Sequence, residues 1–297
     1  TGWKEMRNVL RIVESESPDL VHLHHTASLI SPLILREIVA RYPTVKTVHD
    51  ASLLCPHTGE RLPKVWGGKV CEFPSGIGCL ARRCQPVFPG GLADLARNVW
   101  EKRVSRRIGT IVVSSRFMES ECRRNRFPEG KIAVLPLYVE RQDPGPPTAA
   151  AAGTEGRTLL FVGRLDASKG ISHFLEALCL MRDEAWEAEI VGEGPEGKEI
   201  EKKIRDAGMG GRVALHGKVP AERMGGYYRR ALLLAMPSLI PESFGLVGVE
   251  AMSFGKPVVA YDSGGIREWL ADGVTGFLVE RGNVRALSET MTFLLKD

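Results

Sequence analysis

Two glutamates with a fixed spacing are the first residues in this sequence whose types suggest chemistry. Glu242 and Glu250 are separated by seven residues, and a helix is predicted from about Leu246 to a C-cap glycine at Gly255. Exposed N–H groups at the start of a helix favour a negative ligand such as a phosphate. A carboxylate inside the helix can accept two hydrogen bonds from a diol such as a ribose. The pair therefore fits a nucleotide sugar, and the alternative is a surface helix with two solvated glutamates.

Two cationic residues follow a predicted strand earlier in the chain. Leu159–Val162 has the composition of a buried strand, Gly163 and Arg164 come directly after it, and Lys169 lies in the same turn. A glycine after a strand lets the backbone approach a ligand. Arg164 can bind a phosphate through two hydrogen bonds, whereas Lys169 acts as a point charge. This pattern predicts a diphosphate site, and the alternative is a solvated turn.

Histidines gather at the ends of two predicted strands in the first half of the chain. These strands end at His25 and just before His49, with a helix between them. Such an alternation indicates a parallel sheet, whose ligands gather at the carboxyl ends of its strands. We consider His49 both as a site residue and as a capping or core histidine. Side-chain alternation sends His22 and His24 to one face and His25 to the other, so no metal site is expected there.

The segment 55–89 is rich in glycine and proline, lacks periodicity and contains four cysteines. The alternatives are a structural zinc ion held by all four thiolates, one or two disulfides, and free thiols. A cytosolic enzyme favours metal over disulfide, although no pair has the C-x2-C spacing common in zinc sites. The residues concerned are Cys55, Cys71, Cys79 and Cys84.

A predicted helix at 92–108 has a dense basic face. Two interpretations are open: a core-packed helix with a solvated charged face, and a contact with an anionic membrane surface. The basic residues are Arg97, Lys102, Arg103, Arg106 and Arg107, and the apolar side is assigned to Leu95, Val99 and Trp100.

Composition places the chain among globular proteins and excludes several classes. Of 297 residues, 43% are hydrophobic and 26% are charged. No apolar run approaches the roughly 20 residues that cross a bilayer. The net charge of +4 hides an asymmetry, because residues 1–150 hold 22 Lys and Arg against 15 Asp and Glu. This excess is too modest for nucleic-acid binding, but it suits an anionic surface or acceptor.

The start of the chain carries no secretory signal, so a cytoplasmic location is expected. The basic first half adds the expectation of a contact with the inner face of the cell membrane. Thr1 stands where an initiator Met would, which indicates a fragment or a processed chain.

The stretch Pro241–Gly276 contains both glutamates and continues through Glu-Ala-Met, Gly-Lys-Pro-Val-Val and Asp-Gly-Val-Thr-Gly. It strongly resembles the E-x7-E donor-binding signature of retaining GT-B glycosyltransferases of the family 4 type, and the resemblance reaches from about His22 to the C-terminus. It implies an α/β fold of two Rossmann-like domains whose parallel sheets face across a cleft. The expected parts are a partial acceptor-side domain at 1–142, a linker at 143–156 and a donor-binding domain at 157–297. The strand and glycine-rich loop that usually open the first domain are missing, so a truncated first domain is expected.

The resemblance also implies an activity. A hexose would move from a UDP- or GDP-sugar to a hydroxyl of a glycan or lipid-linked acceptor, with retention of configuration. Cell-surface polysaccharide, lipopolysaccharide or glycolipid synthesis would be the setting. The clamp of Arg164 and Lys169 would replace a divalent metal, so no cofactor is required for the chemistry. The alternatives are another GT-B enzyme, such as a nucleotide-sugar epimerase or a glycan phosphorylase, and a non-catalytic GT-B scaffold.

Residue roles follow from the same resemblance. Glu250 would hold the ribose, Glu242 would hold sugar hydroxyls and support charge at the reacting centre, and His49 would contact the donor sugar. Arg164 and Lys169 would stabilise the leaving diphosphate. The remaining donor-binding positions are Gly163, the loop at Gly192, the backbone at Lys218 and Val219, and the amides of Ser243, Phe244, Gly245 and Leu246. Relatives usually have Pro-Asn-Gly where this chain has Pro136-Leu137-Tyr138.

Overall fold

Strands and helices alternate through both halves of the computed structural model, as the hydrophobic pattern predicts. The structure describes residues 3–26, 30–55, 70–76, 78–81, 84, 89–140 and 157–296. The chain divides into two compact units, Thr1–Pro136 and Leu137–Asp297. The first unit ends before the predicted limit at residue 142, because its last strand already ends at Val134. The predicted linker at 143–156 lies outside the described residues.

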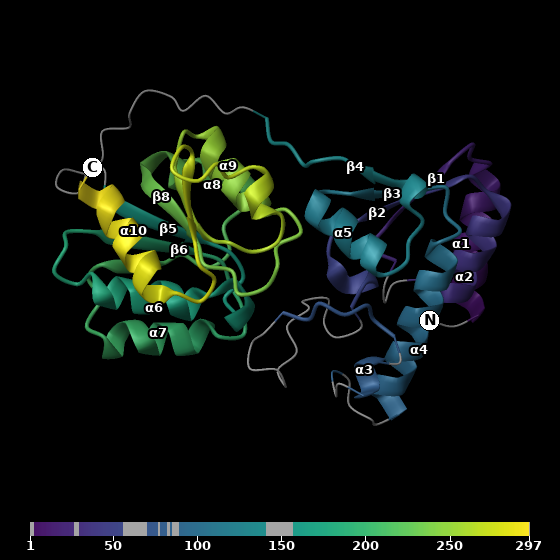
Figure 1. Cartoon of the computed structure of the whole chain (residues 1–297), viewed down its shortest axis with the longest axis horizontal. Coiled ribbons are helices and arrows are strands. Elements are labelled where there is room, and N and C mark those ends of the chain that lie inside the picture. The colour runs from purple at the N-terminus through teal and green to yellow at the C-terminus, as the bar shows by residue number, and fades with distance from the viewer. Residues whose placement is uncertain are drawn as a thin grey trace. The chain divides into compact units, whose positions relative to one another are not determined.

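A four-stranded parallel sheet forms the centre of the first unit, in the order β1-β2-β3-β4 (Figure 1). Its strands are β1 (Val21–His24), β2 (Thr44–Val48), β3 (Thr110–Val113) and β4 (Ile132–Val134). The helices are α1 (Trp3–Glu16), α2 (Pro32–Arg41), α3 (Gly78–Ala81), α4 (Pro89–Ser105) and α5 (Arg116–Arg124), with 3-10 turns at Ala51–Leu53 and Glu129–Lys131. Val48, Ile111 and Val113 of the strands pack in one core with residues of α2 and α5.

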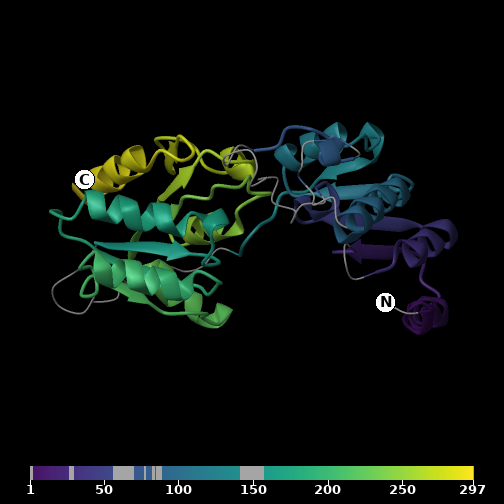
Figure 2. The same cartoon turned by 90° about the horizontal axis from the view of Figure 1, so that it is seen from below.

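The start of α2 has residues that favour a helix N-terminus. Ser31 is the N-cap, its Oγ accepts a hydrogen bond from the Leu33 amide at 3.3 Å, and Pro32 occupies the first helical position. α1 lies beside α2 (Figure 2), and Arg41 of α2 forms an ion pair with Glu14 of α1 at 2.7 Å.

A six-stranded parallel sheet forms the centre of the second unit, in the order β10-β9-β8-β5-β6-β7. Its strands are β5 (Thr158–Val162), β6 (Glu187–Val191), β7 (Val213–Leu215), β8 (Ala231–Met236), β9 (Val258–Tyr261) and β10 (Gly276–Val279). The helices are α6 (Ile171–Leu180), α7 (Gly197–Asp206), α8 (Ala221–Arg230), α9 (Leu246–Ser253) and α10 (Val284–Lys296), with 3-10 turns at Ala167–Lys169 and Gly265–Glu268.

Helices cover both faces of this second sheet (Figure 1). Successive residues of β5 point to opposite faces, so Leu159 and Phe161 join a core with α6, α7 and α10, whereas Leu160 joins a core with α8 and α9. Because the strands are buried on both sides, they have the nearly continuous apolar composition typical of parallel sheets.

Candidate active site

The strand order of the second unit creates a topological switch point. β5 pairs with β6 on one side and with β8 on the other. In such sheets, ligands bind in the crevice outside the carboxyl ends of the strands at the switch point. Gly163 directly follows β5, and Ser238 and Glu242 follow β8. The residues singled out from the sequence therefore lie at the edge of the sheet where a ligand is expected.

Glu242 receives two hydrogen bonds at this edge. Lys169 Nζ lies 2.7 Å from Glu242 Oε1, and Ser238 Oγ donates to the same oxygen at 2.6 Å. The side chain of Glu242 is 11% exposed and that of Lys169 is 29% exposed. Partial withdrawal from water strengthens the attraction between the two charges relative to an open surface. Ser238 was not predicted, although its position just after a buried strand was a signal that could have identified it.

Asp166 shapes the turn that carries Lys169. Its carboxylate accepts hydrogen bonds from the amides of Ser168 at 2.9 Å and Lys169 at 3.3 Å, and so caps the turn Ala167–Lys169. Arg164 donates to Asp166 from the other side and is itself exposed. Burial raises the pKa of Asp166, but the bonds from Ser168 and Arg164 oppose burial and leave that pKa below its usual value. Asp166 therefore stays ionised, and the sequence prediction missed it.

Two glycines at this edge permit backbone approaches that any side chain would block. A Cβ on Gly192 would lie 1.8 Å from the carbonyl oxygen of Gly163, and one on Gly264 would lie 2.2 Å from the carbonyl oxygen of Glu242. Their φ angles are 142° and 68°, which also favour glycine. The Gly265 amide donates to the Glu242 carbonyl at 2.8 Å. These contacts hold the loops of Gly163 and Glu242 in place.

Contacts with Trp269 fix the position of the first residues of α9. Gly245 is its N-cap with φ of 88°, and Trp269 Nε1 donates to the Phe244 carbonyl at 2.5 Å. The Trp269 ring lies so close to Gly248 that a Cβ there would be 2.1 Å from Cη2. Neither Trp269 nor Gly248 was predicted, because only their contact reveals their role. The helix ends as predicted, with Gly255 in the left-handed region at φ of 70°.

A pocket of about 240 Å³ lies at this edge of the sheet. A lysine and the start of a helix both face it, and this combination suits an anionic ligand. The predicted residues that line it are Gly163, Lys169, Glu242, Ser243, Phe244, Gly245 and Leu246. The predicted donor-binding residues that do not line it are Arg164, Gly192, Lys218, Val219 and Glu250.

Lys218 and Val219 lie at the same edge of the sheet, after β7. The Gly192 amide donates to the Gly217 carbonyl at 2.8 Å, so the loops after β6 and β7 are in contact. Lys218 is exposed, whereas Val219 is partly buried against the core that includes α8 and α9.

Glu250 lies inside α9, as predicted, and is bonded to a residue that was not predicted. Tyr228 of α8 donates its hydroxyl hydrogen to Glu250 Oε2 at 2.6 Å. Tyr228 is 2% exposed. Burial, followed by the bond to Glu250, raises the pKa of Tyr228, so the phenol remains a donor. The two residues belong to different helices, and no local pattern links them.

In the first unit, His49 lies among other histidines at the carboxyl ends of β1 and β2. His49 Nε2 lies 2.8 Å from His24 Nδ1, and the ring of His25 stacks on the ring of His49 with centroids 5.1 Å apart. The prediction that His25 faces away from His24 is wrong, because β1 ends at His24 and His25 turns back with φ of 44°. Burial, followed by the neighbouring histidines His25 and His24, lowers the pKa of His49.

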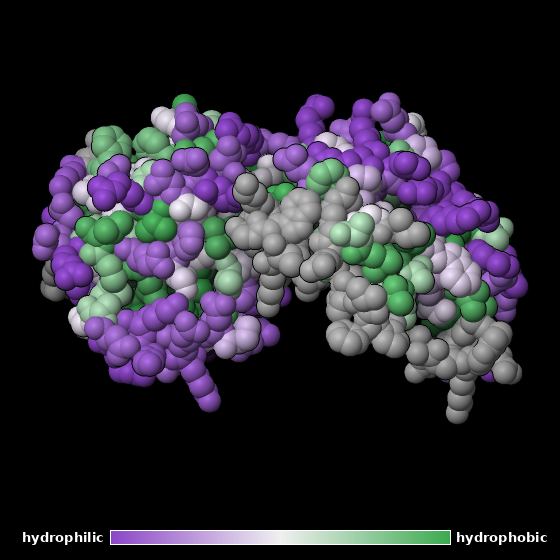
Figure 3. All heavy atoms as spheres, turned by 60° about the horizontal axis from the view of Figure 1, so that its bottom comes forward, coloured by the Kyte–Doolittle hydropathy of each residue, from purple (hydrophilic) through white to green (hydrophobic). Residues whose placement is uncertain are grey.

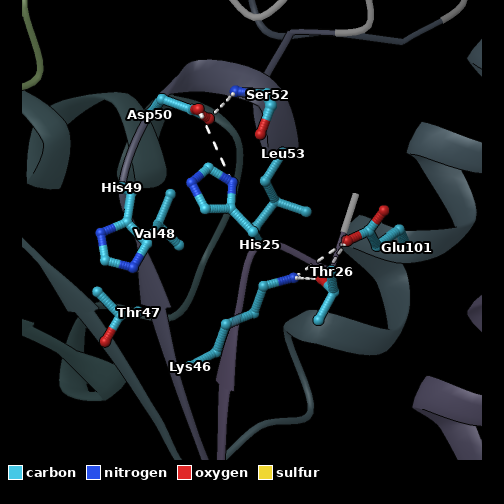
Figure 4. Close-up of a pocket in the computed structure, with 10 residues that line it drawn as sticks. All are labelled: His25, Thr26, Lys46, Thr47, Val48, His49, Asp50, Ser52, Leu53 and Glu101. Carbon is cyan, nitrogen blue, oxygen red and sulfur yellow. Dashed lines mark hydrogen bonds and ion pairs between the residues drawn. The ribbon is translucent and has the colours of Figure 1, made fainter. Parts of the chain in front are cut away.

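A buried ion pair lies near His25, among residues that line the same pocket (Figure 4). Lys46 Nζ of β2 lies 3.1 Å from Glu101 Oε1 of α4, and Thr26 is bonded to both side chains. Both charged residues are almost fully buried. Burial lowers the pKa of Lys46 although Glu101 opposes the shift. A lysine inside an apolar strand was the sequence signal for this pair. The cavity beside it is about 10 Å³, so it has room for about one water molecule.

The cysteine-rich segment is described only in part. Cys79 and Cys84 pack together with Leu95, and the Cys84 amide donates to the Cys79 carbonyl at 2.9 Å. Within the described residues, which include Cys55 and Cys71, no group of three or more His, Cys, Asp or Glu side chains is placed to hold a metal ion. The zinc and disulfide alternatives stay predictions, which metal analysis and thiol titration of purified protein test.

Helix α4 follows its predicted orientation only in part: Arg103 and Arg107 are exposed as expected, but several other residues are not placed as expected. Lys102, assigned to the basic face, is 2% exposed and donates to the Ser75 carbonyl at 2.6 Å. Val99 and Trp100, assigned to the apolar side together with Leu95, are each 43% exposed. Polar groups of the first unit face this helix and draw its polar residues inward, including Glu101 toward Lys46. Of the three residues assigned to the apolar side, only Leu95 is buried.

Among the helices in the described part of the chain, none is long and apolar enough to cross a membrane.

Comparison with known proteins identifies both units. Residues 149–297 match the family model described as glycosyl transferases group 1, and residues 1–137 match a glycosyl transferase 4-like domain. The lipopolysaccharide 1,2-N-acetylglucosaminetransferase of Salmonella typhimurium is 28% identical over 195 residues, 61% of this chain and 51% of that protein. The D-inositol 3-phosphate glycosyltransferase of Frankia alni is 34% identical over 175 residues, 54% of this chain and 42% of that protein. The matches thus span about half the length of these relatives.

Two solved structures resemble the whole chain. Sucrose-phosphate synthase from Thermosynechococcus elongatus has a TM-score of 0.75 at 23% identity, covering 99% of this chain and 68% of that chain. Anabaena HepE, solved in complex with UDP-glucose, has a TM-score of 0.71 at 21% identity, covering 98% of this chain and 72% of that chain. At these identities the likeness concerns the fold, and it confirms the predicted α/β GT-B class. With the family models matching both units, the chain belongs to the group 1 glycosyl transferases.

Proposed function

We propose that this chain transfers a hexose from a nucleoside diphosphate sugar, with UDP or GDP as the nucleotide, to a hydroxyl group with retention of configuration. The observation that carries the proposal is the pocket at the switch point, where Lys169 and the first amides of α9 face one space beside Glu242. This arrangement suits a diphosphate attached to a polyhydroxylated sugar.

The leaving diphosphate gains negative charge in the transition state, and its stabilisation is the main electrostatic task. Lys169 supplies a cation at the pocket, Arg164 supplies a second cation once it exchanges Asp166 for a phosphate, and the amides from Ser243 to Leu246 supply donors. We infer that these groups take the place of a divalent metal, so the chemistry needs no cofactor.

The remaining roles concern the sugar and the ribose. Glu242 holds sugar hydroxyls and supports positive charge at the anomeric carbon, and Glu250 holds the ribose. His49 contacts the donor sugar. The acceptor hydroxyl attacks on the face from which the diphosphate departs, and the leaving phosphate takes its proton. A bond from the acceptor oxygen to the anomeric carbon thus forms as the bond to the phosphate oxygen breaks.

The names of two relatives, which refer to a lipopolysaccharide and to an inositol phosphate, support a proposal for the acceptor class. We propose a glycan or lipid-linked acceptor of cell-surface polysaccharide, lipopolysaccharide or glycolipid synthesis.

Calorimetric titration of UDP and GDP, each with and without EDTA, tests the donor site. Binding of one nucleotide, unchanged by EDTA, supports the site and identifies the base. Loss of binding in EDTA contradicts metal independence, and binding of neither nucleotide contradicts the proposed function. Incubating the matching sugar nucleotide without an acceptor then separates a transferase, which leaves the sugar configuration intact, from an epimerase, which changes it.

Helix α4 supports a second part of the proposal, a contact with an anionic lipid surface. Apolar side chains reach the surface in both units, as the green spheres in Figure 3 show. On α4 the exposed apolar residues Leu92, Val99 and Trp100 share one face with exposed Arg103. Apolar side chains beside a basic one are complementary to an anionic bilayer interface.

Co-sedimentation with vesicles of phosphatidylglycerol and phosphatidylcholine tests this contact. We expect binding that declines with salt and that Val99→Asp weakens by about tenfold, since charge on the apolar face opposes insertion. Leu180→Asp is the matched control, because Leu180 is an exposed apolar residue of the second unit. The proposed lipid contact would be contradicted by a lack of vesicle binding at low salt, or by an equal loss of binding in both variants.

A further inference from the structure

The hydrogen bond between Tyr228 and Glu250 is a feature of the second unit that the proposed function does not use. Glu250 Oε2 accepts the Tyr228 hydroxyl hydrogen at 2.6 Å. The other carboxylate oxygen, Oε1, has no hydrogen-bond partner in the part of the chain that the structure describes. One oxygen is thus held within the protein, while the other is available to a ligand.

The phenol ring is itself held firmly. Tyr228 is 2% exposed and belongs to the core formed with α9. Its ring stacks on Phe254, with centroids 5.4 Å apart and an angle of 24° between the planes. A glutamate has three rotatable side-chain bonds, so a fixed donor on one carboxylate oxygen restricts where the other can point.

We propose that Tyr228 is a positioning residue for the donor nucleotide: it orients the Glu250 carboxylate so that this side chain can accept hydrogen bonds from the ribose hydroxyls. The inference rests on the proposed function, because it takes the ribose role of Glu250 from there. The inference also predicts a specificity. The site prefers ribonucleotides to deoxyribonucleotides, because Tyr228 of α8 fixes the orientation of the carboxylate that binds the ribose. Burial and the carboxylate both raise the pKa of Tyr228, so the donor persists across the physiological pH range.

Binding of ribose and deoxyribose nucleotides separates this role from a merely structural one. The probes are the nucleoside diphosphate that binds, UDP or GDP, and its 2′,3′-dideoxy analogue, titrated into the full chain. Tyr228→Phe keeps the ring and removes only the hydroxyl. We expect it to weaken binding of the ribonucleotide by about 10- to 150-fold, the range for loss of a hydrogen bond to a charged group. Binding of the dideoxy analogue should change by less than about twofold, because that ligand makes no ribose contact with Glu250.

Tyr261→Phe is the matched control in the same unit. Tyr261 is fully buried, and its hydroxyl is bonded to another side chain, His173 Nδ1, at 3.0 Å. The control loses the same group and a comparable bond, so it reproduces any general effect on stability. It should leave the affinities for both nucleotides unchanged.

Each outcome has a distinct meaning. Selective loss of ribonucleotide affinity in Tyr228→Phe, together with a similar loss in Glu250→Ala, supports the positioning role. Equal loss for both nucleotides, or no loss for either, overturns it while nucleotide binding by the unmodified chain still supports the proposed function. If the unmodified chain binds neither nucleotide, the proposed function fails and this inference fails with it.

Discussion

Lys169 and Glu242, which both line the pocket, form an ion pair, and this pairing joins two residues that the proposed reaction uses separately. The carboxylate holds the ammonium at the pocket, where we propose that it meets the diphosphate. Preorganised charge of this kind is most effective where water is partly excluded.

Replacing Lys169 by Ala should lower kcat by about 100-fold or more, the effect of losing one donor to a developing anion. Steady-state assays with the sugar nucleotide identified by calorimetry measure it. Lys203→Ala is the control, because Lys203 of α7 forms an exposed ion pair with Glu199. A kcat within threefold of the unmodified enzyme would mean that Lys169 does not serve the transition state.

The histidines of the first unit predict how its stability depends on pH. Burial, followed by neighbouring histidines, lowers the pKa of both His24 and His49 from 6.5. Below pH 6.5 the unfolded chain therefore binds protons before the folded chain does, and the free energy of unfolding falls as the pH falls. Asp50 opposes the shift of His49 without reversing it.

Urea unfolding at pH 7.5 and pH 5.5 measures this dependence. The double variant His24→Asn, His49→Asn should lose less stability between the two pH values than the unmodified chain. Burial also lowers the pKa of His173. This residue is present in both proteins, so it contributes equally to the pH dependence of their stability. An identical pH dependence in the two proteins would show that His24 and His49 do not cause the loss of stability at low pH.

At the scale of elements, the contact between α9 and Trp269 positions the start of the helix at the pocket. Gly248→Ala should lower the free energy of unfolding by about 1–3 kcal/mol, because its Cβ would overlap a ring that cannot easily move. Denaturant unfolding measures the change. Gly226→Ala in α8 is the control, since its Cβ would meet only Arg230 Nη1 at an ordinary 3.5 Å. For Gly226→Ala we expect no decrease in the free energy of unfolding, or an increase of up to about 1 kcal/mol.

The same elements show where prediction from sequence succeeded. The helix from Leu246 and its glycine at 255 follow from short-range patterns, and both are confirmed. The predicted orientation of α4 was wrong in part, because some of its polar residues find partners outside the helix, such as Lys46 of β2 for Glu101. Helical periodicity shows which residues share a face, but not which face turns inward.

At the scale of the whole molecule, each unit has its own core and sheet. The nucleotide contacts proposed here, apart from the sugar contact of His49, belong to the second unit. A nucleotide without its sugar should therefore stabilise the second unit alone. At a concentration of 100 Kd the gain is about 2.7 kcal/mol.

Hydrogen exchange followed by mass spectrometry measures this effect separately in each unit. Adding UDP, or GDP if that is the nucleotide bound, should slow exchange in β5, β8 and α9 and leave β2 and β3 unchanged. Equal protection of the first sheet would show that the nucleotide engages both units.

The sequence alone determined the parts of the site that lie close together along the chain. The strand before Gly163, the cations that follow it, and Glu250 inside a helix after Glu242 are encoded by local spacing and periodicity. The alternation of strands and helices likewise predicted parallel sheets, because parallel strands need crossover connections.

The tertiary structure alone decided which distant residues meet. Tyr228 reaches Glu250, Ser238 and Lys169 share one oxygen of Glu242, and Lys46 is buried against Glu101. Each contact joins different elements, and its formation depends on how both elements pack on the sheet. No local pattern records that packing, because it results from burying two apolar faces at once.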